Sequence, residues 1–122
     1  MTRVDPTVNF SWGLGSPTPL MTADGFVIRW TGTITAPVSG TYVFSTVSDD
    51  GARLWVNNQQ LINHWQEHTE ATDTGVAVTL QAGQKYSIRL EYYESGGPAT
   101  IKLQWAYPGV GTQIIPQSVL NP

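Results

Sequence analysis

The feature that most constrains the fold is an alternation of apolar and polar side chains with a period of two. In residues 26–34, for example, the apolar side chains of Phe26, Ile28 and Trp30 fall on one face. Such segments are typical of strands that bury one face and expose the other. The chain is therefore predicted to fold from β-strands. The clearest of these segments are residues 26–34, 42–47, 86–92 and 101–105.

Turn sequences separate these segments at short intervals, and about eight strands are expected. A single curved sheet would leave one apolar face in water, so the fold class is predicted to be all-β, an antiparallel β-sandwich. Residues 26–34 and 42–47 flank a Pro-Val-Ser-Gly turn and are expected to form a hairpin. Residues 63–74 contain both histidines and show no clear period, which predicts a long loop.

Length and charge restrict the classes of function. A chain of 122 residues with 40% hydrophobic content fits one domain, expected to span residues 1–122. The net charge of -3, without a basic face, argues against nucleic acid as a partner. No apolar stretch approaches the roughly 18 residues of a membrane span, so no membrane insertion is expected. The absence of cysteine excludes disulfides and thiol catalysis.

Three motifs together resemble one known family. Residues 26–34 read F-x-x-R-W-T-G-x-I, residues 40–44 read G-T-Y-x-F, and residues 48–56 read S-D-D-G-x-R-L-W-V. The match continues to Leu103-Gln104-Trp105 and Ile115-Pro116-Gln117, and so covers nearly the whole chain. These motifs resemble the anthrax protective antigen amino-terminal module, which occurs in bacterial glycosidases, adhesins and toxins and in yeast flocculins.

The resemblance implies a β-sandwich with long loops at one end and a calcium-dependent, lectin-like function. In the lectin members, two adjacent aspartates joined by a cis peptide bind Ca2+, and the ion coordinates neighbouring sugar hydroxyls. Asp49 and Asp50 match that pair. Adjacent side chains of an extended trans chain point to opposite faces, so a cis bond would let both carboxylates reach one ion. The alternative is an ordinary Ser-Asp-Asp-Gly turn.

Calcium takes six to eight oxygen ligands, so a second loop has to contribute. The resemblance places that loop at Glu94-Ser95-Gly96-Gly97. Glu94 stands where the yeast lectins carry an asparagine ligand, and the carbonyls of Gly96 and Gly97 are further candidate ligands. Ser95 is a candidate sugar contact. The alternative for this segment is a simple hairpin turn.

Candidate aromatic side chains for stacking on a sugar ring are Trp65, Tyr93 and Tyr107, which flank loops or fall off the inward face of a strand. A structural role remains the alternative for each. The other tryptophans lie at alternating strand positions, where burial of the ring is expected. They are Trp12, Trp30, Trp55 and Trp105.

The resemblance also implies a context. The expected partner is a saccharide or cell-surface glycan, and the expected location is extracellular or at the cell surface, in an adhesion role. The chain is expected to be a domain excised from a larger secreted protein. The domain itself is expected to lack the usual first strand of the family. An unpaired sheet edge would then favour self-association.

One other function remains open. The chain could be a structural or protein-contact module of a larger surface protein or glycosidase. His64 and His68 are four residues apart and, with Glu67 or Glu70, could hold zinc, although the H-E-x-x-H order is absent and a solvated loop is favoured. A glycosidase needs carboxylates roughly 5 to 10 Å apart, and adjacent aspartates are too close. No enzymatic activity is expected.

Overall fold

The structure, a computed structural model, describes residues 5, 7–13, 26–95 and 99–121, without the side chains of Trp12 and Phe26. Across these residues the chain forms eleven β-strands and one short 3-10 helix. The elements are β1 (Asn9–Gly13), β2 (Phe26–Thr35), β3 (Gly40–Asp49), β4 (Gly51–Val56), β5 (Gln59–His64), β6 (Ala71–Thr74), β7 (Val78–Leu80), β8 (Lys85–Glu94), β9 (Ala99–Tyr107), β10 (Val110–Ile114), η1 (Gln117–Val119) and β11 (Leu120–Asn121).

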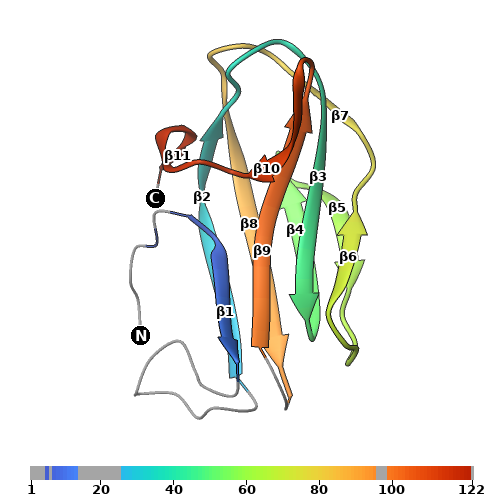
Figure 1. Cartoon of the computed structure of the whole chain (residues 1–122). Coiled ribbons are helices and arrows are strands. Elements are labelled where there is room, and N and C mark those ends of the chain that lie inside the picture. Colours follow the sequence, from blue (N-terminus) through green and yellow to red (C-terminus); the bar gives the residue numbers. More distant parts are fainter. Residues whose placement is uncertain (1–4, 6, 14–25, 96–98, 122) are drawn as a thin grey trace.

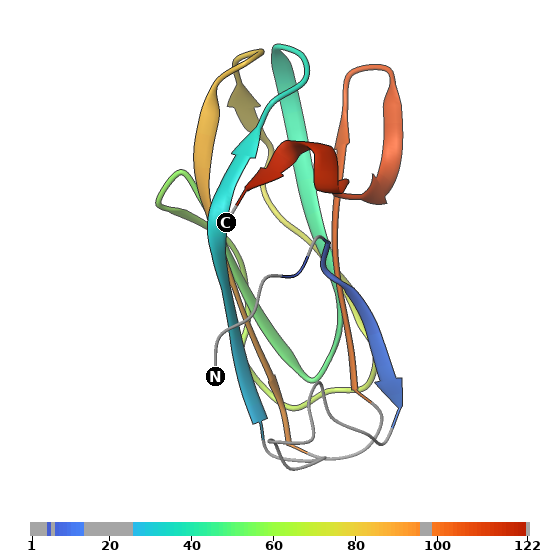
Figure 2. The ribbon, with the colours of Figure 1, turned by 90° about the vertical axis from the view of Figure 1, so that its left-hand side faces the viewer.

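The strands form two antiparallel sheets that face each other (Figures 1 and 2). The six-stranded sheet has the order β1-β9-β3-β6, with β10 also paired to β9 and β7 also paired to β3. The five-stranded sheet has the order β11-β2-β8-β4-β5. The predicted all-β sandwich is confirmed, with more strands than the eight expected.

Alternate side chains of both sheets fill the space between them. In β8, Ile88, Leu90 and Tyr92 are buried, as the period of two predicts. Facing them, Tyr42 and Trp105 are fully buried, with ring centroids 5.2 Å apart. Burying large rings from both sheets adds to the apolar area that holds the sandwich together.

The predicted hairpin of residues 26–34 and 42–47 is wrong. β2 pairs with β8 along its full length, whereas β3 pairs with β9 in the other sheet. Residues 36–39 therefore carry the chain from one sheet to the other. Alternation shows which face of a strand is buried, but it does not show which strand lies beside it.

The predicted long loop at residues 63–74 is also partly wrong. β5 continues to His64, and residues 71–74 form β6 on the edge of the six-stranded sheet, paired with β3. Only residues 65–70 connect them. The side chains of β6 are alternately half-exposed and exposed, and none of its positions belongs to a buried apolar row. The sequence therefore carries no strand signal there.

The outer face of the five-stranded sheet carries a cluster of arginines around one acid. Glu91 accepts hydrogen bonds from Arg29 Nε at 3.0 Å and from Arg53 Nη2 at 2.7 Å. Burial disfavours the charged carboxylate, but the hydrogen bonds and charges of Arg53 and Arg29 outweigh it and lower the pKa of Glu91. Glu91 is thus held ionised on a face that is otherwise basic.

The outer face also corrects the expected burial of Trp55. Its ring lies on this face, with the guanidinium of Arg89 over it at 4.1 Å from the centroid. Trp105 is buried as expected, and Trp30 is half-buried with its Nε1 donating to Asp5 Oδ2 at 2.8 Å. The side chain of Trp12 lies outside the described residues. Among the described residues, no helix has the length and apolar character needed to cross a membrane.

Candidate functional site

The candidate site lies where the chain passes from one sheet to the other at the end of β3. Asp49 is the last residue of β3 and Gly51 is the first of β4, so Asp50 is the corner between the sheets. Figure 2 shows this turn at one end of the sandwich. The Asp49–Asp50 peptide bond is cis, as the family resemblance implies.

Three hydrogen bonds fix the backbone of this corner. Tyr92 Oη donates to the carbonyl of Asp49 at 2.6 Å, and Ser48 Oγ donates to the carbonyl of Asp50 at 3.0 Å. The N–H of Asp50 donates to the carbonyl of Tyr93 at 3.3 Å. These three main-chain groups are thereby bonded within the protein, and the carboxylates are the charged groups of the corner that can meet a ligand.

Asp50 is buried and oriented by donors from two loops. Its Oδ2 accepts hydrogen bonds from Ser95 N at 2.9 Å and Ser95 Oγ at 3.0 Å, and its Oδ1 accepts one from His68 N at 3.2 Å. Burial disfavours the charge, but these hydrogen bonds outweigh it and lower the pKa of Asp50. Asp50 is therefore the member of the pair that stays ionised most readily.

Asp49 behaves in the opposite way. Burial, followed by the hydrogen bond and negative charge of Asp50, raises the pKa of Asp49. The negative charges of two carboxylates this close repel each other, so both are ionised readily only when a cation lies beside them. A cation at the corner would remove that conflict.

Glu94 completes an acidic cluster with the aspartate pair. It continues the inward row of β8 beyond Tyr92 and is only 1% exposed. One carboxylate oxygen from each of Asp49, Asp50 and Glu94 can be chosen so that all lie within 4.8 Å of one another. Oxygens bound to one calcium at about 2.3 to 2.6 Å lie at most about 5 Å apart, so the spacing fits that ion. The donors are all oxygen, which also suits calcium.

The charge of the cluster affects the tyrosine beneath it. Burial, followed by the negative charges of Glu94, Asp49 and Asp50, strongly raises the pKa of Tyr92. Its hydroxyl therefore keeps its proton and donates to Asp49, as the hydrogen bond requires.

Two of the predicted aromatic residues lie beside the corner. The Tyr93 and Trp65 rings meet edge to face, with centroids 4.7 Å apart. Tyr93 lies over Gly51, where a Cβ would overlap its ring, so the glycine allows the ring to pack on the sheet. The Arg53 guanidinium lies 3.8 Å from the Trp65 centroid and covers one face of that ring. At most one face of Trp65 remains for another ring.

The structure brings together six of the predicted site residues, namely Asp49, Asp50, Glu94, Ser95, Tyr93 and Trp65. It does not bring Tyr107 to them. Asp49 is opposite Thr100 at the start of β9, and Tyr107 ends that strand, roughly 20 Å away at about 3.3 Å per residue. Tyr107 packs instead on Tyr42, with centroids 5.1 Å apart. Gly96 and Gly97 lie outside the described residues.

Three contributors were not predicted from the sequence. Ser48 belongs to the S-D-D-G motif and could have been singled out as a turn residue. His68 contributes its backbone N–H, which has no sequence signature. Arg53 is three residues after Asp50, but its contact with Trp65 depends on the path of residues 65–70.

Two of the similar known proteins are named as anti-sigma factor proteins. Over 120 residues, the chain is 42% identical to anti-sigma-I factor RsgI3 of Acetivibrio thermocellus, covering 98% of this chain and 18% of the relative. A solved anti-sigma factor domain-containing protein from Clostridium clariflavum is similar at 36% identity and a TM-score of 0.94, over 100% of this chain and 41% of that one. The chain thus spans less than half of these relatives.

More distant solved structures share the fold. A PA14 sugar-binding domain from an RTX adhesin has a TM-score of 0.77 at 21% identity, over 94% of this chain and 76% of that one. The epithelial adhesin 6 A domain of Candida glabrata has a TM-score of 0.73 at 17% identity, over 93% of this chain and 64% of that one. Residues 1–118 match the PA14 domain. The chain therefore belongs to the PA14 domain family.

Proposed function

We propose that this PA14 domain is a calcium-dependent carbohydrate-binding module. The observation that carries the proposal is the acidic cluster of Asp49, Asp50 and Glu94, an all-oxygen donor set within 4.8 Å at one end of the sandwich. Tyr93 and Trp65 lie beside it as candidate sugar-stacking rings. A calcium ion held there would supply coordination positions for adjacent sugar hydroxyls.

The chain's own residues would prepare that site. Ser95 and His68 hold Asp50 in one orientation, so little freedom is lost when a ligand binds. Ser95 Oγ is close enough to the cluster to contact a sugar hydroxyl, and Tyr93 offers an apolar surface to a sugar ring. Carbonyls of Gly96 and Gly97 are proposed as further calcium ligands.

Distant relatives support a saccharide as the ligand class. The RTX adhesin domain is described as sugar-binding, and the epithelial adhesin 6 A domain was solved in complex with Galb1-3GlcNAc. Their identities to this chain, 21% and 17%, establish only the shared fold. The sugar itself is left to experiment. We also propose an extracellular location, since a glycan-binding site must be reached by glycans.

A second candidate is a structural or protein-contact module. The observation that favours it is that relatives at 36% and 42% identity are named as anti-sigma factor proteins. In a longer protein of that kind, the acidic corner could stabilise a loop without binding sugar. We propose no catalysis, because the three carboxylates crowd within 4.8 Å, which leaves no room for a sugar between them.

The test is binding to a panel of saccharides in calcium, in magnesium and in excess chelator. We expect binding in calcium only, lost in Asp50→Asn and retained in Glu70→Gln, which removes an exposed acid from the neighbouring loop. Tyr93→Ala should weaken binding, whereas Tyr107→Ala, at the far end of the sandwich, should not.

Two outcomes would overturn the proposal. Saccharide binding that persists in chelator would remove calcium from the mechanism. Calcium binding without retention of any saccharide would favour the structural or protein-contact module.

A further inference from the structure

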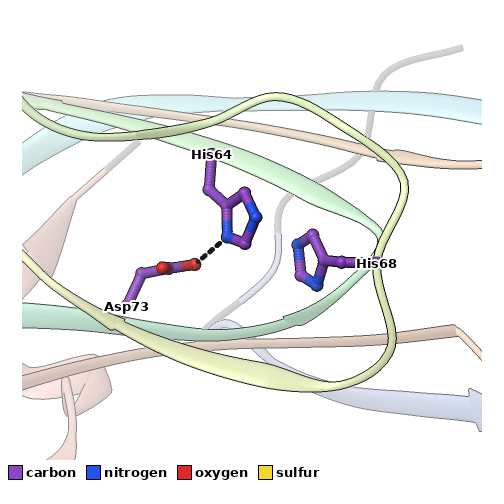
Figure 3. Close-up of side chains that lie close together, drawn as sticks. All are labelled: His64, His68 and Asp73. Atoms are coloured by element: carbon purple, nitrogen blue, oxygen red, sulfur yellow. Dashed lines mark hydrogen bonds and ion pairs between the residues drawn. The ribbon is translucent and has the colours of Figure 1, made fainter.

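A second cluster of side chains of the types that can bind metals lies on the edge where the two sheets come together. His64 ends β5 in the five-stranded sheet, Asp73 lies in β6 of the six-stranded sheet, and His68 lies between them in sequence. Figure 3 shows the three side chains pointing toward one another. The acidic partner therefore comes from β6, and not from Glu67 or Glu70 as the sequence spacing suggested.

The three side chains are close enough to share one ion. His64 Nδ1 lies 2.8 Å from Asp73 Oδ2, and the two imidazole rings are stacked with centroids 3.9 Å apart and planes 11° apart. One ligand atom from each of His64, His68 and Asp73 can be chosen within 4.8 Å of the others. All three residues are half-buried.

The hydrogen bonds of His68 present a nitrogen lone pair. Its Nδ1 contacts the carbonyl of Thr69, which can only accept, so Nδ1 carries the proton. In the neutral ring Nε2 is then an acceptor, and this buried atom has no hydrogen-bond partner among the described residues. A nitrogen lone pair that is buried and unpaired is what a metal ion would satisfy.

His64 is oriented in the same manner. Its Nδ1 lies beside the Asp73 carboxylate, so an ion that displaces the proton between them can be bound by both groups. Its Nε2 lies 3.2 Å from the side-chain amide of Gln66, whose oxygen can accept the remaining ring proton when the amide is turned over. Because the two rings are stacked nearly parallel and each nitrogen lone pair lies in the plane of its ring, one ring must rotate for both to reach one ion. The carboxylate is then the third donor.

We infer that His64, His68 and Asp73 form a site for a transition-metal cation of the zinc class. Imidazole nitrogen with one carboxylate suits Zn2+, whereas Ca2+ and Mg2+ require oxygen donors, so this site differs in chemistry from the aspartate corner. With three protein ligands, one coordination position remains for water. The ion would tie β5 to β6 across the sheet edge.

The site would also restrain the segment that serves the corner. Trp65 lies between the two histidines in sequence, and the backbone N–H of His68 donates to Asp50 Oδ1. A metal bound to both histidines would hold this segment in place. The inference itself needs neither calcium nor sugar.

The test is calorimetric titration of chelator-stripped protein with ZnCl2 in excess calcium, with Co2+ absorption spectra to report the coordination. We expect one Zn2+ per chain, and weakening by at least about tenfold in His68→Gln and in Asp73→Asn. Glu70→Gln, an exposed acid of the same segment, should bind like the wild type. The chain has two histidines and no cysteine, so no other imidazole or thiol competes.

Asp50→Asn separates this inference from the proposed function, because it should lose calcium and keep zinc. Circular dichroism checks that each variant is folded. If His68→Gln is not folded, Asp73→Asn is used for the test. No zinc uptake by the wild type would overturn the inference. Uptake unchanged by the folded ligand variants, or lost in Asp50→Asn alone, would overturn it as well.

Discussion

Replacing Asp50 with asparagine should destabilise the domain by amounts that depend on calcium. The carboxylate accepts hydrogen bonds from Ser95 on one oxygen and from His68 on the other. Asparagine keeps one oxygen, so an NH2 group must face one set of donors. A lost hydrogen bond to a charged group costs about 1.5 to 3 kcal/mol, offset in part by less repulsion from Asp49, which leaves a net loss of about 1 to 2 kcal/mol without calcium.

Calcium adds a second loss. At about 100 times its dissociation constant, a ligand stabilises the wild type by about 2.7 kcal/mol, which the variant should not gain. The combined loss in calcium is then about 4 to 5 kcal/mol. For a domain of this size each kcal/mol moves the melting midpoint by about 3 to 5 °C, so we expect a drop of several degrees in chelator and about 12 to 25 °C in calcium.

The assay is thermal unfolding followed by circular dichroism in calcium, magnesium and chelator. Glu70→Gln is the matched control for the loss of one negative charge near Asp49, and it should retain the calcium-dependent shift. An Asp50→Asn midpoint lowered equally in calcium and in chelator would refute the reasoning, because the residue would then have only a structural role.

Three further predictions concern the sheet around the site. Glu91→Gln should lower the free energy of unfolding by about 1 to 2 kcal/mol at neutral pH, since its arginine partners are partly exposed. Because the pKa of Glu91 is lowered on folding, its contribution to stability is fully present above the ordinary value of 4.5 and is lost as the pH falls through the folded-state pKa. Urea titrations should therefore show the stabilities of the wild type and the variant converging in acid. A stability difference that stays constant with pH would contradict this account. Gly51→Ala should cost about 1 to 3 kcal/mol because its Cβ would overlap Tyr93, and the cost should shrink in a Tyr93→Ala background if the ring is the cause. Asn58 has φ of 63°, so Asn58→Ala should destabilise by about 1 kcal/mol whereas Asn58→Gly should not, as chemical denaturation would show; equal effects would exclude backbone conformation as the reason.

Much of the core was predictable from sequence because one signal, the alternation of apolar side chains, acts locally. The buried row of Ile88, Leu90 and Tyr92 follows directly from it. The Asn57-Asn58 turn was predictable for a similar reason, since both residues adopt positive φ and asparagine tolerates it. Each of these inferences needs only neighbours along the chain.

Strand partners and site neighbours were harder to predict because they depend on residues far apart in sequence. The pairing of β2 with β8 and not with β3 is set by the packing of whole sheets. Tyr107 resembled Tyr93 in sequence, but the direction of β9 carries it to the opposite end. Asp73 was not linked to the histidines because the polar strand that carries it left no periodic pattern.

The position of the aspartate corner has a mechanical consequence. β3 belongs to one sheet and β4 to the other, and the corner joins them directly. A pull applied to a ligand held there would enter both layers at once, as tension along two strands that are each paired on both edges. Rupture would require several ladder hydrogen bonds to shear together instead of opening one by one from a free edge. The corner is thus a place where a small contact could withstand a large force.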